Sequence, residues 1–279
     1  MCRFVWCLSK ALTVIALLVV FIAYGESSEH WDYRHQDQWP SEYCKTGKQQ
    51  SPIALSQSQS SPKEIGELKL DNFDQTIEQL LVYQNGHTVV VEIPDNCSCS
   101  KPSLSGAGLT NDYTLQSFHF HWPSEHTIDA IQYDLETHFV FYATKYHSFE
   151  KAQEQKYGLT VLGLLHLKTN YTQSNNFRAI AEAAKKVAKK INKKVLTTEE
   201  VNLKQFLPSD YQKYFSYTGS LTTPNCLEYV NWIVLKNTGN IQHSHFQDLT
   251  KIYTEDGDLL EFNNRKLQDL NGRTVYYQG

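Results

Sequence analysis

The sequence predicts a mainly β fold of the α+β class, organised as a single domain. Runs rich in β-branched, leucine and aromatic residues recur along most of the chain, with turn-forming residues between them. Only one segment shows clear helical periodicity. About 250 residues remain after a predicted leader, which is within the range of one large domain.

Six runs have the composition of β-strands. The pair Asn85-Gly86 lies between two of them and indicates a hairpin turn. No internal repeat or linker divides the chain. The six predicted strands are Leu80–Tyr83, Thr88–Ile93, Leu115–His121, Gln132–Tyr142, Thr160–Leu167 and Tyr229–Leu235.

The clearest helix is predicted over residues 176–194, because apolar residues recur there at spacings of three and four. These residues are Phe177, Ile180, Ala184, Val187 and Ile191. The lysines of this segment fall mostly on the opposite face. We interpret them as a solvated surface in preference to a membrane-binding or polyanion-binding surface.

The N-terminus has the features of a secretory signal. Arg3 and Lys10 precede an apolar run over residues 11–23, and Ala23-Tyr24-Gly25 offers a cleavage site between small residues. The run is short for a membrane-spanning helix. We therefore expect a signal peptide over residues 1–25, a domain over residues 26–279, a secreted product and no stable membrane insertion after cleavage.

Charge and cysteine content narrow the class further. The formal net charge of −4 provides no electrostatic footprint for nucleic acid. In an oxidising compartment, the four cysteines beyond the leader allow three disulfide pairings: Cys44, Cys97, Cys99 and Cys226. The patterns Asn96-Cys97-Ser98 and Asn170-Tyr171-Thr172 make Asn96 and Asn170 candidate glycosylation sites.

The most informative motif is Phe-His-Phe-His-Trp-Pro-Ser-Glu-His at residues 118–126. Residues two apart in a strand point to the same face, so one strand would present His119 and His121. A neighbouring strand that contains Glu136-Thr137-His138 would add His138. Three imidazoles with room for a fourth ligand are typical of a catalytic zinc site. This pattern predicts an enzyme that uses a metal-bound hydroxide.

A chance pairing of histidines must be weighed against this interpretation, since the chain contains eleven histidines. His243-Ser244-His245 has the same spacing in a polar stretch without a third partner nearby, and we interpret it as a solvated surface feature. The pair His119 and His121 differs because of its aromatic context and the nearby Glu136-Thr137-His138.

Several further short motifs follow one another along the chain, and their order can be compared with that in known families. They are His30-Trp31-Asp32-Tyr33, Gln49-Gln50-Ser51-Pro52-Ile53, Asn85-Gly86-His87, the 118–126 motif, Glu136-Thr137-His138, Gly158-Leu159-Thr160-Val161-Leu162-Gly163, Tyr217-Thr218-Gly219-Ser220-Leu221-Thr222-Thr223-Pro224 and Leu270-Asn271-Gly272-Arg273. Over about residues 31–276 the chain resembles the α-class carbonic anhydrases. The resemblance implies a large, twisted, mostly antiparallel central sheet with peripheral helices. It also implies reversible hydration of carbon dioxide to bicarbonate and a proton.

The resemblance assigns roles to particular residues. It implies that His119, His121 and His138 bind Zn²⁺ and that Glu136 orients His138. Relatives usually carry glutamine two residues before the first ligand, where this chain has Ser117. Thr222 and Glu125 resemble the pair that directs the nucleophile towards the substrate.

Further residues match the proton pathway and the substrate pocket. His87 matches the proton shuttle, Tyr33 and Asn85 match residues that order the relay water, and His126 is expected to brace the structure. Relatives often carry asparagine where this chain has Val90. The expected pocket wall, in which Leu162 would replace a smaller valine and narrow the pocket, comprises Val140, Leu162, Leu221, Thr222, Thr223, Val230 and Trp232.

The resemblance also suggests a disulfide, because extracellular relatives link the positions of Cys44 and Cys226. Cys97 and Cys99 could pair with each other, pair between chains or remain free. Two competing functions share this fold: a secreted non-enzymatic matrix, adhesion or storage protein, and a hydrolase of small esters that uses the same zinc site. The expected partner is a small-molecule substrate, carbon dioxide or bicarbonate, and the chain would be a monomer or a dimer.

Overall fold

The computed structural model describes residues 30–170 and 177–279, and residues 31–279 form one compact unit. The predicted leader and the Tyr171-Thr172 part of the second glycosylation pattern lie outside the described residues. Within the described part, no helix has the length and apolar character needed to cross a membrane.

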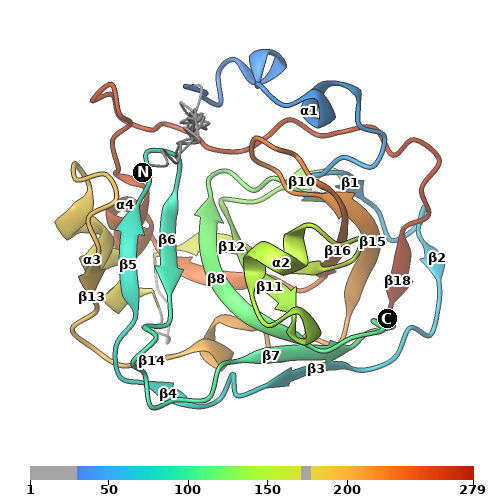
Figure 1. Cartoon of the computed structure of the whole chain (residues 1–279), viewed down its shortest axis with the longest axis horizontal. Helices are drawn as coiled ribbons and strands as arrows, with labels where there is room; N and C mark the ends of the chain where they lie inside the picture. Colours follow the sequence, from blue (N-terminus) through green and yellow to red (C-terminus); the bar gives the residue numbers. More distant parts are fainter. Residues whose placement is uncertain (1–29, 171–176) are drawn as a thin grey trace, which may run out of the picture. The chain divides into compact units, whose positions relative to one another are not determined.

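A large sheet dominates the described unit (Figure 1). Its strands lie in the order β13 (Val195–Leu196), β5 (Leu81–Gln84), β6 (Val89–Glu92), β8 (Tyr113–His121), β11 (Leu135–Ala143), β12 (Leu159–Thr169), β16 (Glu228–Leu235), β15 (Tyr214–Ser220), β18 (Tyr276–Gln278) and β2 (Ser61–Pro62). Strands β3 (Leu68–Asp71), β7 (Ser103–Gly106) and β17 (Gly239–Gln242) join this order from the side. Most pairs are antiparallel, whereas β12–β16, β12–β17 and β18–β2 are parallel. The predicted fold class is confirmed.

The remaining elements are short. Small sheets are formed by β1 (Ala54–Leu55), β9 (Thr127–Ile128) and β10 (Ile131–Gln132), and by β4 (Thr76–Ile77) with β14 (Val201–Asn202). The helices are α1 (Glu42–Thr46), α2 (Phe149–Gln153), α3 (Arg178–Val187) and α4 (His243–Thr250), with 3-10 turns at η1 (Gln36–Gln38), η2 (Thr144–Tyr146) and η3 (Leu203–Phe206). Figure 1 shows α1, α3 and α4 at the periphery of the sheet, with α3 and α4 near β5 and β13, and α2 drawn across the sheet beside β11.

Five of the six predicted strands agree with the structure within two residues at each end: β5, β6, β8, β12 and β16. The sixth prediction, Gln132–Tyr142, is divided, because β10 ends at Gln132 and β11 begins at Leu135. Glu136 and His138 therefore lie on β11, directly beside β8.

The predicted helix over residues 176–194 is shorter in the structure, where α3 ends at Val187. The inward-facing apolar residues continue only to Val187, and Lys189 and Lys190 are exposed. Asn192 then has a φ of 57°, a left-handed conformation that asparagine tolerates better than most residues. Ile191 forms a bridge with Gln84 instead of continuing the helix.

The two faces of the central sheet pack into different clusters of buried residues. One face contributes Phe118 and Phe139, and the other contributes Val140 and Trp232. Because side chains alternate along a strand, the histidines at positions 119, 121 and 138 lie on the same face as Val140. The candidate site is therefore built on rigid strands at the centre of the sheet.

Candidate active site

The pairing of β8 with β11 brings the three histidines together. His138 lies directly opposite His119, and His121 lies opposite Glu136. The ring centroids are 5.0 Å apart for His119 and His121, 5.3 Å for His119 and His138, and 4.5 Å for His121 and His138. One ring nitrogen from each histidine lies within 4.8 Å of the others. These imidazoles could hold one metal ion.

Hydrogen bonds occupy one nitrogen on two of these rings. His121 Nδ1 is 2.7 Å from the backbone oxygen of Asn263, and His138 Nε2 is 2.8 Å from Glu136 Oε1. Both acceptors require a protonated nitrogen, which assigns the tautomers and leaves His121 Nε2 and His138 Nδ1 as lone-pair donors. His121 Nε2 is buried without a hydrogen-bond partner among the described residues. An unpaired buried nitrogen is costly, and a metal ion would satisfy it.

The third histidine has a different environment. His119 is partly exposed, so the cluster remains reachable from solvent. Ser117 lies two residues earlier on the same strand, but no hydrogen bond between Ser117 and His119 is found within the described residues. The chain thus supports two candidate ligands through hydrogen bonds and leaves the third without the support suggested by relatives.

The protonation of these rings is compatible with metal binding. Burial lowers the pKa of His121 to about 4, although the bond to Asn263 opposes this change. Burial, together with the neighbouring imidazoles, also lowers the pKa of His119 well below its usual value. Burial lowers the pKa of His138 as well, despite the opposing effect of Glu136. Neutral rings at neutral pH have the lone pairs that coordination requires.

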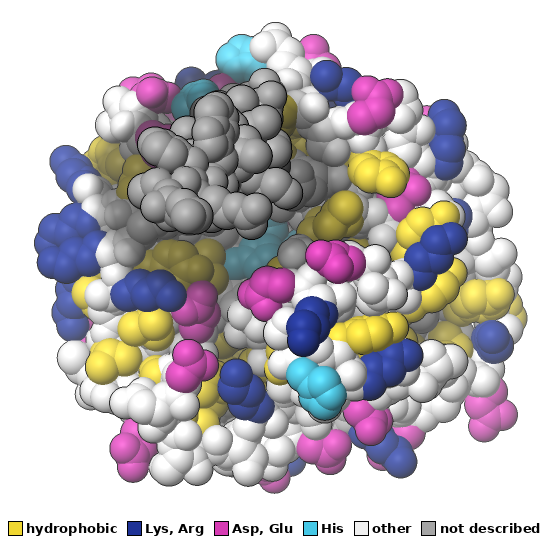
Figure 2. Space-filling model, in the orientation of Figure 1, with side chains coloured by type: hydrophobic (Ala, Val, Ile, Leu, Met, Phe, Trp, Pro, Cys, Tyr) yellow, Lys and Arg dark blue, Asp and Glu magenta, His cyan; other side chains and the backbone are white. Residues whose placement is uncertain are grey.

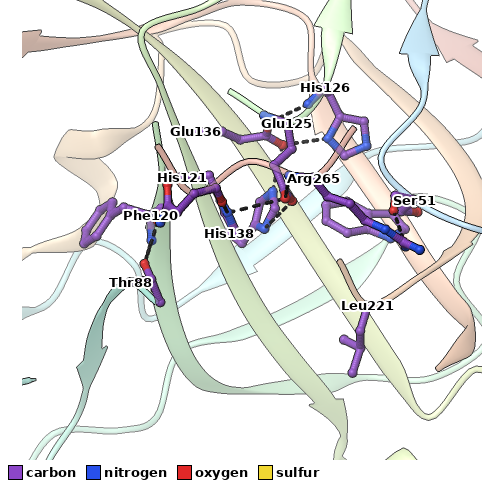
Figure 3. Close-up of polar contacts among 12 residues, drawn as sticks. Ser51, Thr88, Phe120, His121, Glu125, His126, Glu136, His138, Leu221 and Arg265 are labelled. Atoms are coloured by element: carbon purple, nitrogen blue, oxygen red, sulfur yellow. Dashed lines mark hydrogen bonds and ion pairs between the residues drawn. The ribbon is translucent and has the colours of Figure 1, made fainter. Parts of the chain in front are cut away.

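Glu136 is the central acceptor behind this cluster (Figure 3). Its Oε2 accepts backbone N–H bonds from Glu125 and His126, both at 2.8 Å, and its Oε1 lies 2.7 Å from His126 Nδ1. Burial favours the neutral acid, but His126 and His138 outweigh it and hold the pKa of Glu136 well below its usual value. An ionised Glu136 is consistent with four bonds to its oxygens.

His126 extends this network away from the three histidines. Its Nε2 lies 2.7 Å from the hydroxyl of Tyr217, which in turn lies 2.8 Å from Ser51 Oγ. His126, Glu136 and His138 are also close enough together to suggest a second metal site. Their facing atoms are hydrogen-bonded to one another, so this group is better explained as a brace.

Glu125 lies on the other side of the candidate ligands. Its Oε1 accepts a 2.8 Å bond from the backbone N–H of Arg265, and its Oε2 lies 3.9 Å from His138 Nδ1. Burial raises the pKa of Glu125 to about 7, while His138 and the Thr222 hydroxyl oppose the increase. Glu125 Oε2 is buried without a hydrogen-bond partner among the described residues, so it is available to accept a hydrogen bond.

Asn263 and Arg265 were not identified from the sequence. The Asn263 amide donates to the backbone oxygens of His87 and Phe120 at 2.9 and 2.8 Å. The buried guanidinium of Arg265 donates to Gln50 Oε1 and to the Ser51 carbonyl, both at 2.8 Å. Both residues lie in a polar segment without regular periodicity, so the sequence contains no signal for their burial.

His87 lies in the turn between β5 and β6. Its ring stacks on Trp31 with centroids 3.7 Å apart and planes 9° apart. Asn85 Oδ1 accepts backbone N–H bonds from His87 and Thr88 at 3.1 and 2.9 Å, so it shapes this turn. The Tyr33 hydroxyl is buried without a hydrogen-bond partner among the described residues, and is available to a solvent molecule.

The pocket-wall prediction was wrong for Leu162. On β12, Leu162 lies opposite Phe139, whereas Val161 lies opposite Val140. Directly opposed residues share a face, so Val161 lies on the histidine face and Leu162 lies in the cluster on the other face. The expected narrowing by a leucine does not apply, because a valine occupies this position. Val140, Val230 and Trp232 pack in one cluster with Leu221 against it; Thr222 is buried and Thr223 half-buried.

The cysteines form two disulfides in the structure. Cys44 is bonded to Cys226, as the resemblance implied, and Cys97 is bonded to Cys99. The first disulfide connects α1 with the segment between β15 and β16, which carries Thr222. The pair His243 and His245 begins α4 and joins none of the candidate metal-binding groups found among the described residues.

Fold and site together define a class of protein: a mainly β enzyme domain whose central sheet presents three imidazoles as a candidate metal centre. A family model for eukaryotic-type carbonic anhydrases matches residues 27–279. The chain belongs to this family and is a carbonate dehydratase, the enzyme class of reversible carbon dioxide hydration.

Individual relatives show how far the similarity extends. The chain is 28% identical to mouse (Mus musculus) carbonic anhydrase 6 over 272 residues, which cover 92% of this chain and 81% of the relative. It is 32% identical to mouse carbonic anhydrase 15, with 97% and 89% covered. A carbonic anhydrase from Pectobacterium carotovorum is 28% identical, with 96% and 99% covered.

Proposed function

We propose that this chain catalyses reversible hydration of carbon dioxide with Zn²⁺ held by His119, His121 and His138. The observation that carries this proposal is the convergence of the three imidazoles, with His121 Nε2 buried without a hydrogen-bond partner among the described residues and the rings of His121 and His138 fixed through their other nitrogens. When bound, the metal would act as a Lewis acid that lowers the pKa of a coordinated water. Three nitrogen donors suit zinc and leave a position for solvent.

Glu125 and Thr222 orient the reacting groups in this proposal. The backbone N–H of Arg265 fixes Oε1 of the Glu125 carboxylate, and in this proposal the free Oε2 accepts a hydrogen bond from the Thr222 hydroxyl. Because its own proton is used in that bond, the Thr222 hydroxyl can only accept a hydrogen bond from the nucleophile. This directionality points a lone pair of the nucleophile at the substrate carbon.

The remaining residues bind the substrate and remove the proton. Val140, Val161 and Trp232 provide an apolar wall that suits a small apolar molecule. His87 lies in a turn near this site, and we assign its imidazole as the group that accepts the released proton and transfers it to buffer. Tyr33, with its buried hydroxyl, is assigned to order the intervening solvent.

We also propose that the chain is exported. Residues 1–25 would be removed as a signal peptide, and residues 26–279 would form the secreted enzyme, which is consistent with the disulfide between Cys44 and Cys226. Asn96 and Asn170 are exposed and remain candidates for glycosylation. N-terminal sequencing of the product secreted by eukaryotic cells tests this: an intact N-terminus at Met1 would contradict cleavage.

The substitution His119→Ala tests the catalytic proposal. Removing one of three protein ligands should abolish stoichiometric zinc binding and reduce carbon dioxide hydration by at least about 100-fold, because the other two donors do not hold the ion. Zinc analysis and stopped-flow hydration measure these effects. His243→Ala/His245→Ala, which alters the other His-x-His pair, should retain zinc and activity. Retained zinc in His119→Ala would remove His119 as a ligand. Zinc-loaded native protein without hydration activity would instead favour a non-enzymatic role.

A further inference from the structure

A regular pattern of lysines runs from α3 towards β13. Three adjacent pairs occur, each beginning four residues after the previous pair, and no acidic residue lies among these ten positions. The lysines, which we call the lysine surface, are Lys185, Lys186, Lys189, Lys190, Lys193 and Lys194. The whole chain has a net charge of −4, so this concentration of positive charge is local.

All six lysine side chains are exposed, whereas Ala183, Ala184 and Val187 of the same segment are buried. The α3 helix therefore packs its apolar side inwards and turns Lys185 and Lys186 outwards, and the four lysines that follow its end at Val187 are exposed as well. Figure 2 shows Lys and Arg side chains gathered at the left edge of the molecule, over α3 and β13 as placed in Figure 1. All six lysines are therefore accessible to a ligand from solvent.

Only part of this charge is neutralised by nearby carboxylates. Lys185 lies 3.1 Å from Asp248, and Lys194 lies 2.8 Å from Glu92. In the part of the chain that the structure describes, no ion pair is found for Lys186, Lys189, Lys190 and Lys193. Lys185 and Lys186 lie on α3, and the other four lysines follow its end at Val187. Exposed like charges this close in the sequence repel one another, and a polyanion would relieve that repulsion.

We propose, in place of the solvated surface expected from the sequence alone, that the lysine surface binds a sulfated polysaccharide. Such a polymer presents fixed anions in a line, which complements lysine pairs repeated along one surface. Within the ten positions, Val187 is buried and Ile191 is half-buried in its bridge to Gln84, so the segment offers little apolar surface to a lipid bilayer. The choice over nucleic acid rests on the proposed export, because an exported chain meets extracellular polysaccharides.

Binding to immobilised heparin at about 0.15 M salt tests this proposal. The full secreted chain should be retained, and Lys186→Gln/Lys190→Gln/Lys193→Gln should weaken the affinity at least about tenfold and reduce its salt dependence. The matched control is Lys45→Gln/Lys69→Gln/Lys151→Gln, which removes the same charge from separate exposed positions and should change the affinity less than about threefold. Metal-free protein should bind equally well, so failure of the proposed zinc chemistry would leave this result unaffected.

Four outcomes would overturn the proposal: no retention of the native chain, an equal loss in the control, equal binding to desulfated heparin, or tighter binding to anionic phospholipid vesicles or DNA than to heparin. Thermal unfolding and carbon dioxide hydration show whether each variant is folded. If the triple variant is unfolded, Lys186→Gln/Lys193→Gln repeats the comparison with two substitutions that affect no described contact.

Discussion

Hydrogen bonds to the ring nitrogens distinguish the three candidate ligands at the residue scale. His121 and His138 each have an acceptor on the nitrogen that faces away from the site, and these acceptors fix the ring and increase its basicity. His119 has no such bond to Ser117 among the described residues. A serine side chain is short, and it lies on β8 opposite Val140. We therefore expect His119 to be the weakest of the three ligands.

A longer hydrogen-bond acceptor at position 117 should strengthen zinc binding by His119. Ser117→Gln places an amide oxygen two residues before His119 on the same face of β8. One added hydrogen bond is worth about 1 kcal/mol, so zinc should dissociate about fivefold more slowly. The measurement is the rate of zinc transfer to an excess of chelator. Ser117→Leu, which has similar bulk but no acceptor, is the control. Equal retardation by both substitutions would show that packing, and not the hydrogen bond, is responsible.

The role of His87 is also tested by a single substitution. If its ring exports the proton, His87→Ala should reduce turnover about tenfold in dilute buffer, and added imidazole should restore most of it. Stopped-flow hydration at several buffer concentrations measures this. His35→Ala, at an exposed histidine that contacts Asp32, should have no effect. Turnover of His87→Ala that is unchanged in dilute buffer would exclude the shuttle role.

At the scale of elements, the disulfide between Cys44 and Cys226 joins segments 182 residues apart. Closing so long a loop restricts the unfolded chain, and its removal should cost about 4 kcal/mol of unfolding free energy. Cys44→Ser/Cys226→Ser should also lower turnover, because the tethered segment carries Thr222. Denaturant unfolding and hydration rates test both effects. Cys97→Ser/Cys99→Ser removes a disulfide that closes a very short loop, and it should cost less stability. Equal losses in both variants would contradict this account.

The local sequence pattern predicted the strands that are continuously apolar. It failed for strands that form mainly because they pair with segments distant in the sequence. The β8 and β11 strands could be predicted because aromatic and β-branched residues fill them. The β15 strand, Tyr214–Ser220, was missed because serine, threonine and glycine interrupt it, and its pairing with β16 and β18 stabilises it.

The candidate site shows the same division between local and long-range information. The three histidines could be predicted from spacing of two along a strand and one further partner. Asn263 could not, because its contacts with His121 and His87 join residues more than 140 positions apart. The error at Leu162 was one of register: a shift by one residue moves a side chain to the opposite face.

For the whole molecule, buried histidines make stability depend on pH. His166 lies on β12 with its Nε2 2.8 Å from Thr137 Oγ1, and its Nδ1 is buried without a partner within the described residues. Burial lowers the pKa of His166 to about 3, from 6.5. Between these values the unfolded chain binds a proton that the folded chain does not. Acid therefore favours unfolding, and stability falls as the pH decreases from about 6.5 towards 3.

His166→Gln should weaken this acid sensitivity, because glutamine keeps a polar partner for Thr137 but cannot be protonated. One proton difference corresponds to a slope of about 1.4 kcal/mol per pH unit, so the unfolding free energy of the variant should decrease less steeply by about 1 kcal/mol per pH unit between pH 4 and 6. Urea unfolding of metal-free protein at several pH values measures the slope. The absolute stability of the variant can fall at every pH, since the substitution also alters packing. Only the slope of the unfolding free energy against pH measures the proton that His166 takes up on unfolding.

His147→Gln, at an exposed position, controls for the loss of a histidine. If the native chain and His166→Gln lose stability at the same rate as the solution is acidified, then His166 becomes protonated without unfolding, and the buried ring must have access to solvent through a motion of β12 or its neighbours.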